Sequence, residues 1–218
     1  YQVTTANITS SPVVADGLVF ISSYDGRVYA LNQSLGIQKW NFTTGGSVTS
    51  SPAVADGKVF CGSEDGRLYA LNEFTGAWLW DYITSPTAPI ISTPAVSEGF
   101  VAFGCTNNKL YALETTSGAP VWPVPFSTGG PVKSSPAVDM DELLAVVGSD
   151  DGNVYGIDMI LGGYRWSSSI GSAVGLSSPA ISGNGLVYIG ATDGFIHCLD
   201  ETNGAELWSY PTIGSLYS

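Results

Sequence analysis

The sequence predicts an all-β protein, a β-propeller of about five four-stranded antiparallel blades. Three observations lead to this prediction. A unit of about forty residues occurs five times, Asp-Gly turns divide the unit into short strands, and several strands are apolar without alternation. Four-stranded sheets arranged around an axis explain all three, because a sheet covered on both faces needs apolar residues on both.

The repeat is defined by a proline, a glycine and a tryptophan at nearly constant spacing. Each unit opens on Ser-Pro or Thr-Pro, and the tryptophan always lies four residues after the repeat glycine. The prolines are Pro12, Pro52, Pro94, Pro136 and Pro179; the glycines are Gly36, Gly76, Gly118, Gly162 and Gly204; the tryptophans are Trp40, Trp80, Trp122, Trp166 and Trp208. Residues 1–218 are therefore expected to form a single domain, with repeats at approximately 10–50, 51–92, 93–134, 135–177 and 178–218.

The strands within a unit follow from its turn residues. In the second unit we expect strands at 53–55, 58–63, 67–71 and 77–82. Asp56-Gly57 separates the first two, and Asp-Gly between β-rich runs is a strong hairpin signal because type I′ turns need positive φ at both positions. The third unit has Asn108 where the other units have a turn glycine, and Asn also tolerates positive φ.

The proline and the tryptophan predict where each strand lies in a blade. Proline cannot donate a hydrogen bond to a β-ladder, so Pro52 and its equivalents are expected to open the inner edge strand, which lines the central channel. The tryptophans are expected on the outer strand, where the indole packs between neighbouring blades. The long loops 84–92 and 123–134 would join successive blades on one face, and we expect binding there first.

The charge of the chain argues against several classes of partner. The net charge is −12 and only 7 residues are Lys or Arg, so no basic surface is available for a phosphate backbone. Nucleic acid and anionic membrane surfaces are therefore not expected partners. No apolar run approaches the roughly 18 residues that a transmembrane helix needs, so membrane insertion is not expected either.

One segment of each unit resembles the repeat of the quinoprotein, or PQQ-like, β-propeller family. These segments read "ALNQSLGIQKW", "ALNEFTGAWLW", "ALETTSGAPVW", "GIDMILGGYRW" and "CLDETNGAELW". The family repeat reads roughly Ala-x-Asx-x-x-Thr-Gly-x-x-x-Trp, and the resemblance implies a propeller over nearly the whole chain. It also implies two functional branches: dehydrogenases of about eight blades that bind the quinone with Ca²⁺ near the channel, and non-catalytic assembly or surface proteins.

The cysteines point to the non-catalytic branch. The dehydrogenases are marked by an adjacent Cys-Cys pair, whereas Cys61, Cys105 and Cys198 lie far apart in this sequence. We therefore expect no enzymatic activity and no cofactor. The three cysteines fall on repeat positions and are expected to be buried free thiols with a packing role. Because their number is odd, at least one is unpaired unless it bonds another chain.

Neither the histidine nor the acidic residues predict a strong catalytic or metal site. His197 is the only histidine, and it takes a third-strand position that is tyrosine in the other repeats, so we expect a packing role. Asp139, Asp141 and Glu142 are weak candidates for a cation site, since Ca²⁺ needs about six or more oxygen ligands. The aspartates before the third strands are explained by hairpin turn chemistry.

Glycans are a further class of partner that the sequence allows. Asn7, Asn32 and Asn41 lie in Asn-x-Ser/Thr sequons and are glycosylation candidates if the protein is exported. Four other aromatic residues could stack on a sugar, although packing between blades explains them as well. They are Trp78, Tyr82, Tyr164 and Tyr210.

The two ends of the sequence leave the number of blades open. The chain starts at Tyr1 rather than Met, which suggests a mature or excised segment. Residues 1–5 and 209–213 have the same phase in the repeat, and a closed ring needs only one of them. We favour a five-blade unit, which could be part of a propeller of about seven or eight blades, a ring with a spare outer strand, or a subunit whose spare strand pairs with the next molecule.

These observations predict a non-enzymatic scaffold for protein interaction, adhesion or surface assembly, located outside the cell, at the cell surface or in the periplasm. A protein partner, or a second copy, would bind through loop faces or an outer edge strand. Three alternatives remain: a fragment of a quinone-dependent dehydrogenase, a multivalent carbohydrate-binding propeller, and a head-to-tail filament subunit.

Overall fold

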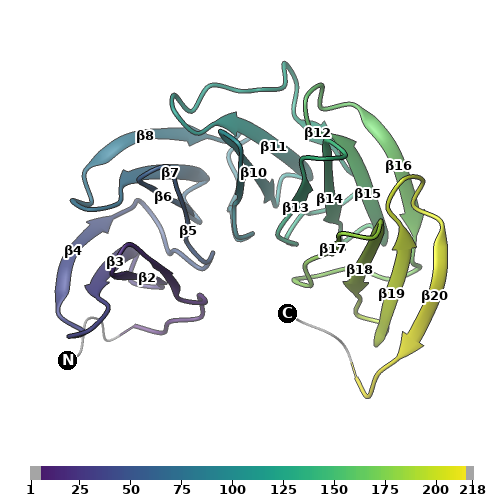
Figure 1. The fold of residues 1–218 in the computed structure, drawn as a ribbon, viewed down its shortest axis with the longest axis horizontal. Helices are drawn as coiled ribbons and strands as arrows, with labels where there is room; N and C mark the ends of the chain where they lie inside the picture. Colours follow the sequence, from purple (N-terminus) through teal and green to yellow (C-terminus); the bar gives the residue numbers. More distant parts are fainter. Residues whose placement is uncertain (1–5, 215–218) are drawn as a thin grey trace.

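The computed structural model describes residues 6–214, which form five four-stranded antiparallel sheets (Figure 1). We call the sheets blade 1, 2, 3, 4 and 5 in chain order, and in each of them the strands follow one another from the inner to the outer edge. The prediction of an all-β propeller with four-stranded antiparallel blades is confirmed. The described residues contain no helix long and apolar enough to cross a membrane.

Equivalent strands are similar in length in the five blades, except for the short outer strand of blade 3. Blade 1 contains β1 (Val13–Ala15), β2 (Leu18–Ser23), β3 (Arg27–Asn32) and β4 (Gln38–Thr43). Blade 2 contains β5 (Ala53–Ala55), β6 (Lys58–Gly62), β7 (Arg67–Asn72) and β8 (Trp78–Ile83). Blade 3 contains β9 (Ala95–Ser97), β10 (Phe100–Cys105), β11 (Lys109–Glu114) and β12 (Phe126–Ser127). Blade 4 contains β13 (Ala137–Asp139), β14 (Leu144–Gly148), β15 (Asn153–Asp158) and β16 (Tyr164–Ser169). Blade 5 contains β17 (Ala180–Ser182), β18 (Leu186–Gly190), β19 (Phe195–Asp200) and β20 (Glu206–Pro211).

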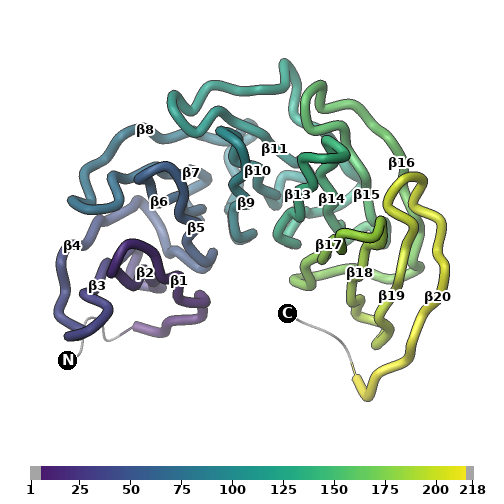
Figure 2. Tube along the Cα trace, in the orientation of Figure 1, coloured from purple at the N-terminus to yellow at the C-terminus, as the bar shows by residue number. Residues whose placement is uncertain are grey.

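The blades lie side by side along an open arc, with the first strand of each blade on the inside (Figures 1 and 2). The inner strands β1, β5, β9, β13 and β17 contact one another in this order. Within residues 6–214, no sheet fills the opening between blade 5 and blade 1. The interpretation as a closed five-blade ring is therefore wrong. The predicted outer-strand segment at residues 1–5 lies outside the described residues.

The predicted Asp-Gly hairpins have the backbone conformation that they need. Asp16 and Gly17 have φ values of 43° and 79°, and Asp56 and Gly57 have 53° and 69°. Two successive residues with positive φ match the right-handed twist of the flanking strands, which is why Asp-Gly is favoured there. Asn108 has φ 67°, as expected for a residue that replaces a turn glycine.

Tryptophan joins each blade to the next. The indole Nε1 of Trp40 donates a hydrogen bond to the backbone carbonyl of Glu73 in blade 2 at 2.8 Å. The same ring lies over the repeat glycine of blade 2, because a β-carbon placed on Gly76 would come within 2.6 Å of it. Equivalent bonds join Trp80 to Thr115, Trp122 to Met159 and Trp166 to Glu201. The predicted wedge between blades is thus present at four junctions, and it explains the glycine: any side chain there would displace the indole.

Blade 3 departs from the predicted strand pattern. Trp122 was expected on an outer strand, but the outer strand β12 is Phe126–Ser127 and Trp122 precedes it. Pro120, Pro123 and Pro125 surround the tryptophan, and a proline cannot donate to the ladder. The segment 123–134 is consequently not a continuous loop, because it contains β12. Trp122 is nevertheless buried and keeps its contact with blade 4.

A buried serine two residues before each proline ties the incoming loop to the second strand. Ser50 Oγ donates to the carbonyl of Gly62 at 2.8 Å and accepts from the Gly62 N–H at 2.9 Å. Ser10 and Ser92 make the same pair of bonds with Ser22 and Gly104, and Ser134 and Ser177 accept from the N–H groups of Gly148 and Gly190. The serine therefore satisfies backbone groups that would otherwise be buried without a partner.

The residue directly before each proline links neighbouring blades. The N–H of Ser11 donates to Ser51 Oγ at 2.8 Å, and the N–H of Ser51 donates to Thr93 Oγ1 at 3.3 Å. The series continues from Thr93 to Ser135 and from Ser135 to Ser178. We call these four bonds the hydroxyl belt. The belt explains why a hydroxyl residue precedes every repeat proline, a role that sequence reasoning missed.

Candidate functional site

A cavity of about 600 Å³ lies at the inner side of the arc, where the loops of four blades converge. It is lined by Ile91, Lys133, Asp150, Ala173, Gly175, Leu176 and Thr192. Ile91 and Lys133 belong to the two long inter-blade segments, 84–92 and 123–134, in which binding was expected. The structure therefore brings these two segments to one cavity.

A second cavity of about 360 Å³ shares Ile91 and Leu176 with the first. Its other lining residues are Thr9, Tyr24, Thr49 and Glu64. Most residues of both cavities occupy two repeated positions, the third residue before the repeat proline and the turn residue after the second strand. The first position is held by Thr9, Thr49, Ile91, Lys133 and Leu176, and the second by Tyr24, Glu64, Asp150 and Thr192. We call the surface formed by these residues the concave mouth.

The concave mouth combines apolar side chains with a neutralised charge pair. Lys133 Nζ lies 2.5 Å from Asp150 Oδ2, and Lys133 is the only cation among the described lining residues. Asp150 Oδ1 is buried without a hydrogen-bond partner. Ile91 and Leu176 supply apolar surface, and the threonines supply hydroxyl groups. Glu64 adds one carboxylate that this pair does not neutralise. A preformed apolar hollow with a few polar groups is typical of a ligand site.

The lining does not fit the quinone and Ca²⁺ of the dehydrogenases that the repeat resembles. A Ca²⁺ ion takes about six or more oxygen ligands. Within residues 6–214 no group of three or more His, Cys, Asp or Glu side chains is placed to hold a metal ion. The quinone carries carboxylate groups, and the one lysine in the mouth is already paired with Asp150.

The weak cation candidates lie away from the mouth, at the hairpin between β13 and β14. Asp139 Oδ1 accepts hydrogen bonds from the N–H groups of Asp141 at 2.8 Å and Glu142 at 3.1 Å, so the carboxylate closes the turn. Asp139 also contacts the adjacent blade. Burial, followed by the charges of Asp139 and Glu142, raises the pKa of Glu201 in blade 5.

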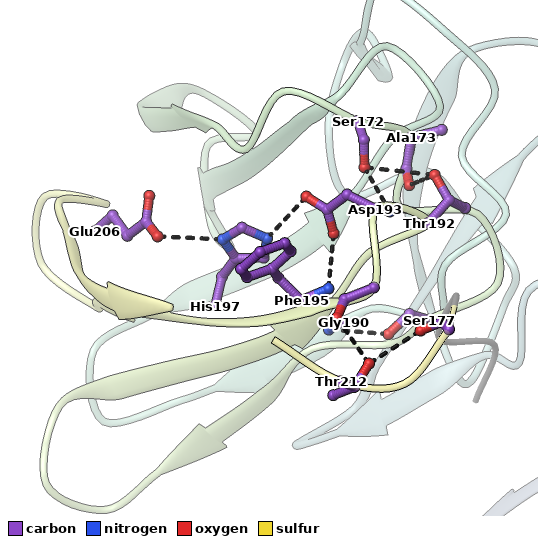
Figure 3. Close-up of polar contacts among 12 residues, drawn as sticks. Ser172, Ala173, Ser177, Gly190, Thr192, Asp193, Phe195, His197, Glu206 and Thr212 are labelled. Carbon is purple, nitrogen blue, oxygen red and sulfur yellow. Dashed lines mark hydrogen bonds and ion pairs between the residues drawn. The ribbon is translucent and has the colours of Figure 1, made fainter. Parts of the chain in front are cut away.

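His197 lies on β19, buried between two carboxylates (Figure 3). Its Nδ1 is 3.3 Å from Glu206 Oε1, and its Nε2 is 3.5 Å from Asp193 Oδ2. In three other blades the equivalent tyrosine donates its hydroxyl hydrogen to the turn aspartate: Tyr29 to Asp25, Tyr69 to Asp65 and Tyr155 to Asp151. His197 thus replaces tyrosine in a pair that holds the turn, which agrees with the expected packing role.

The three cysteines are buried free thiols, as predicted. Burial raises the pKa of all three, and for Cys61 to about 12. A thiol with a raised pKa carries little thiolate at neutral pH and is a poor nucleophile.

The sequons and the proposed sugar platform lie at separate places in the arc. Asn7 and Asn41 are exposed, whereas Asn32 is partly buried and its Oδ1 accepts the N–H groups of the two turn residues 34 and 35. Trp78 and Tyr82 lie on β8, Tyr164 on β16 and Tyr210 on β20. These aromatic residues are spread over three blades, so the structure does not bring them together into one platform (Figure 1).

The blades and their repeat define a PQQ-like β-propeller. A family model described as outer membrane protein assembly factor BamB matches residues 2–210. Because the match covers most of the sequence, the chain belongs to this family of PQQ-like repeats, and the predicted resemblance is confirmed. No curated protein sequence matches the chain.

Solved structures with the same fold include both functional branches. BamB from Moraxella catarrhalis has a TM-score of 0.78 at 23% identity, over 93% of this chain and 61% of that one. The computationally designed protein Ika8 gives 0.81 at 20% identity, over 95% of this chain and 63% of the design. The quinohemoprotein alcohol dehydrogenase from Comamonas testosteroni gives 0.79 at 19% identity, over 96% of this chain and 43% of the enzyme. The chain thus spans less than two thirds of each structure, and the likeness shows the fold.

Proposed function

We propose that this protein is a non-enzymatic scaffold of the cell envelope that binds a partner protein at its concave mouth. The observation that carries the proposal is the cavity of about 600 Å³, with apolar residues around a neutralised Lys133–Asp150 pair. The family description, outer membrane protein assembly factor, supports a role in protein interaction and an envelope location.

The bound segment would be an extended, largely apolar stretch of the partner that docks through its side chains. The inner strands are only three residues long and each follows a proline closely, so they offer a poor edge for adding a strand. Ile91 and Leu176 are shared by both cavities and would form the centre of the contact.

A peptide-binding experiment tests the proposal. The probe is a fluorescein-labelled ten-residue peptide that alternates leucine with serine, and anisotropy measures its binding to the full chain. Leu176→Asp places a charge at the shared centre and should weaken binding at least about tenfold. Ile160→Asp, at an exposed turn outside the mouth, is the matched control and should leave binding unchanged. Equal binding by both variants and the unsubstituted chain would show that the mouth is not the site.

The dehydrogenase alternative is tested separately, because it needs a different ligand. Titration of the chain with the quinone and Ca²⁺ should leave the quinone absorbance spectrum unchanged, since the described residues of the mouth include no unpaired cation and no set of metal ligands. A spectral change that Lys133→Ala abolishes would favour the enzyme instead.

A further inference from the structure

In every blade, the turn after the second strand places one residue at the concave mouth, and the backbone of this residue is held in the same way each time. Its N–H donates a hydrogen bond to a carbonyl of the loop that enters the blade. These bonds join Tyr24 to Asn7, Glu64 to Ser47, Thr106 to Pro89, Asp150 to Pro131 and Thr192 to Ala173, at 2.9–3.2 Å. The backbone is therefore fixed, and the blades differ in the side chain that they present here.

Two of these five side chains are carboxylates, and only one of the two has a cation beside it. In blade 4, Asp150 Oδ2 lies 2.5 Å from Lys133 Nζ. Lys133 is the third residue before the repeat proline, and in blade 2 the same position is Thr49. Within residues 6–214, Glu64 forms no ion pair. Blade 2 thus keeps the acidic group, but it has a short neutral side chain where blade 4 has the lysine.

The space beside Glu64 is the cavity of about 360 Å³, and an aromatic ring of the preceding blade borders it. This ring belongs to Tyr24, which is 46% exposed. Ser47 joins the two turns, because its Oγ donates to the Tyr24 carbonyl at 3.2 Å and its own carbonyl accepts from the Glu64 N–H at 2.9 Å. The carboxylate and the ring are therefore held at one cavity, whose apolar wall is formed by Ile91 and Leu176.

A carboxylate together with an aromatic ring favours a cationic ligand. A ring face attracts a cation that lies within about 6 Å of its centroid, and the carboxylate adds an ion pair. Arginine suits both groups, since its planar guanidinium stacks on aromatic rings and donates two parallel hydrogen bonds to a carboxylate. None of the described residues that line this cavity is a cation. The net charge of −12 also attracts a cation toward the protein.

We infer that the cavity beside Glu64 is a subsite for one arginine side chain of the partner's segment. This inference rests on the proposed function and deepens it, because it names the kind of segment that the mouth selects. The arginine pairs with Glu64 as Lys133 pairs with Asp150 in blade 4, and its guanidinium lies on the Tyr24 ring. Apolar residues on either side of the arginine contact Ile91 and Leu176.

The test compares two labelled peptides that differ in one charge. The first is the ten-residue leucine-serine peptide with a central serine replaced by arginine. The second has citrulline at that position, which has nearly the shape of arginine without its charge. Anisotropy with the full chain should show that the arginine peptide binds roughly fivefold to tenfold more tightly. This ratio should fall when the salt concentration is raised from about 0.05 M to about 0.5 M.

Two substitutions should remove the preference for arginine by different routes. Glu64→Gln removes the carboxylate and should reduce the ratio of the two affinities to about twofold or less, with the citrulline peptide bound as before. Thr49→Lys retains Glu64 but supplies a cation from within blade 2, as Lys133 does in blade 4, and should reduce the ratio to the same extent. Glu114→Gln, an exposed acid on β11 outside the mouth, is the control and should keep the full ratio.

The outcomes separate this inference from the proposed function. Equal affinities of the two peptides for the unsubstituted chain overturn the arginine subsite and leave the proposed function standing, whereas no binding of either peptide overturns both. A ratio that stays high in Glu64→Gln shows that the arginine binds elsewhere, and this also overturns the inference. Free arginine amide provides the last arm: if it displaces the labelled peptide as effectively as the unlabelled peptide does, the ligand is a small cation and not a protein segment.

Discussion

The inner and outer parts of a blade junction are held together by different interactions. At the outer rim an indole fills the space above a glycine, as Trp40 does over Gly76. At the inner edge the hydroxyl belt uses single hydrogen bonds of 2.8–3.3 Å. Removing a buried aromatic side chain typically costs about 3–5 kcal/mol, whereas one hydrogen bond contributes about 0.5–1.5 kcal/mol. The comparison teaches that the outer contact carries stability, while the inner contact sets the alignment of neighbouring blades.

The largest effect is expected from Trp80→Ala, which removes one outer wedge. The substitution should lower the free energy of unfolding by roughly 3–5 kcal/mol, because it leaves a cavity over Gly118 and the Thr115 carbonyl without its donor. Urea denaturation measures this loss. Trp78→Ala is the matched control on the same strand; its side chain is 55% exposed, so it should cost less than about 1 kcal/mol. Equal losses would contradict the assignment of stability to the wedge.

An intermediate effect is expected from Ser92→Ala at the inner end of blade 3. The hydroxyl of Ser92 donates to the Gly104 carbonyl and accepts from its N–H, both at 2.9 Å in a buried setting. Losing both bonds leaves two buried backbone groups unsatisfied and should cost about 1–3 kcal/mol. Thermal denaturation tests this against Ser117→Ala, an exposed serine in the same blade. A Ser92→Ala chain as stable as the control would show that the serine is dispensable.

A smaller effect is expected from Thr93→Val, which removes one hydroxyl of the belt without changing the side-chain shape. The N–H of Ser51 then loses its acceptor in the neighbouring blade. The stability loss should be about 0.5–1.5 kcal/mol, and hydrogen exchange at Ser51 should become faster. Thr116→Val, at an exposed turn, should leave both quantities unchanged. Unchanged exchange at Ser51 in Thr93→Val would mean that the belt bond has no role in solution.

The smallest effect at neutral pH is expected from Glu73→Gln, and it should depend on pH. Burial, followed by the charge of Asp16, raises the pKa of Glu73 above its ordinary value of 4.5. The folded state then holds the proton more tightly than the unfolded chain does. The resulting stabilisation is complete below pH 4.5 and is lost as the pH rises through the folded pKa.

Glu73→Gln removes this pH-dependent loss. Compared with the unsubstituted chain, the variant should gain stability as the pH rises from 4 to 8, with a Tm difference that grows in the same direction. Glu114→Gln, an exposed acid on β11, serves as the control for the general loss of one negative charge. A Tm difference that stays constant over this pH range would contradict the prediction.

The parts of the fold that depend on local sequence could be predicted well. The turn at Asp16-Gly17 is specified by two adjacent residues, and the spacing from the repeat glycine to the tryptophan is the same in every unit. The positions of the strands on either side of these residues could therefore be predicted. Trp122 shows where this reasoning fails. The repeat phase placed it on an outer strand, but the three prolines around it have no N–H to donate, so only an isolated bridge forms at Pro120 and the ladder forms later, at β12. In blade 3 the prolines near Trp122, rather than the phase of the repeat, determine where the outer strand forms.

The contacts across blades were harder to predict, because they join residues about forty positions apart. The hydroxyl belt did leave a signal in the sequence. The residue directly before each of the five repeat prolines carries a hydroxyl group, and the residue two positions before each proline is always serine. The concave mouth left no such signal in the sequence. Its positions hold Thr9, Thr49, Ile91, Lys133 and Leu176, which share no chemistry, and only the folded arc shows that they face one hollow.

The position three residues before each proline therefore has a freedom that the neighbouring positions lack. The two residues that follow it, a serine and then a serine or threonine, are committed to holding the blades, whereas this residue makes no bond that the junction requires. Exchanging it, or transplanting a whole blade, would alter recognition while the framework stays intact. Such a scaffold can acquire a new specificity one blade at a time.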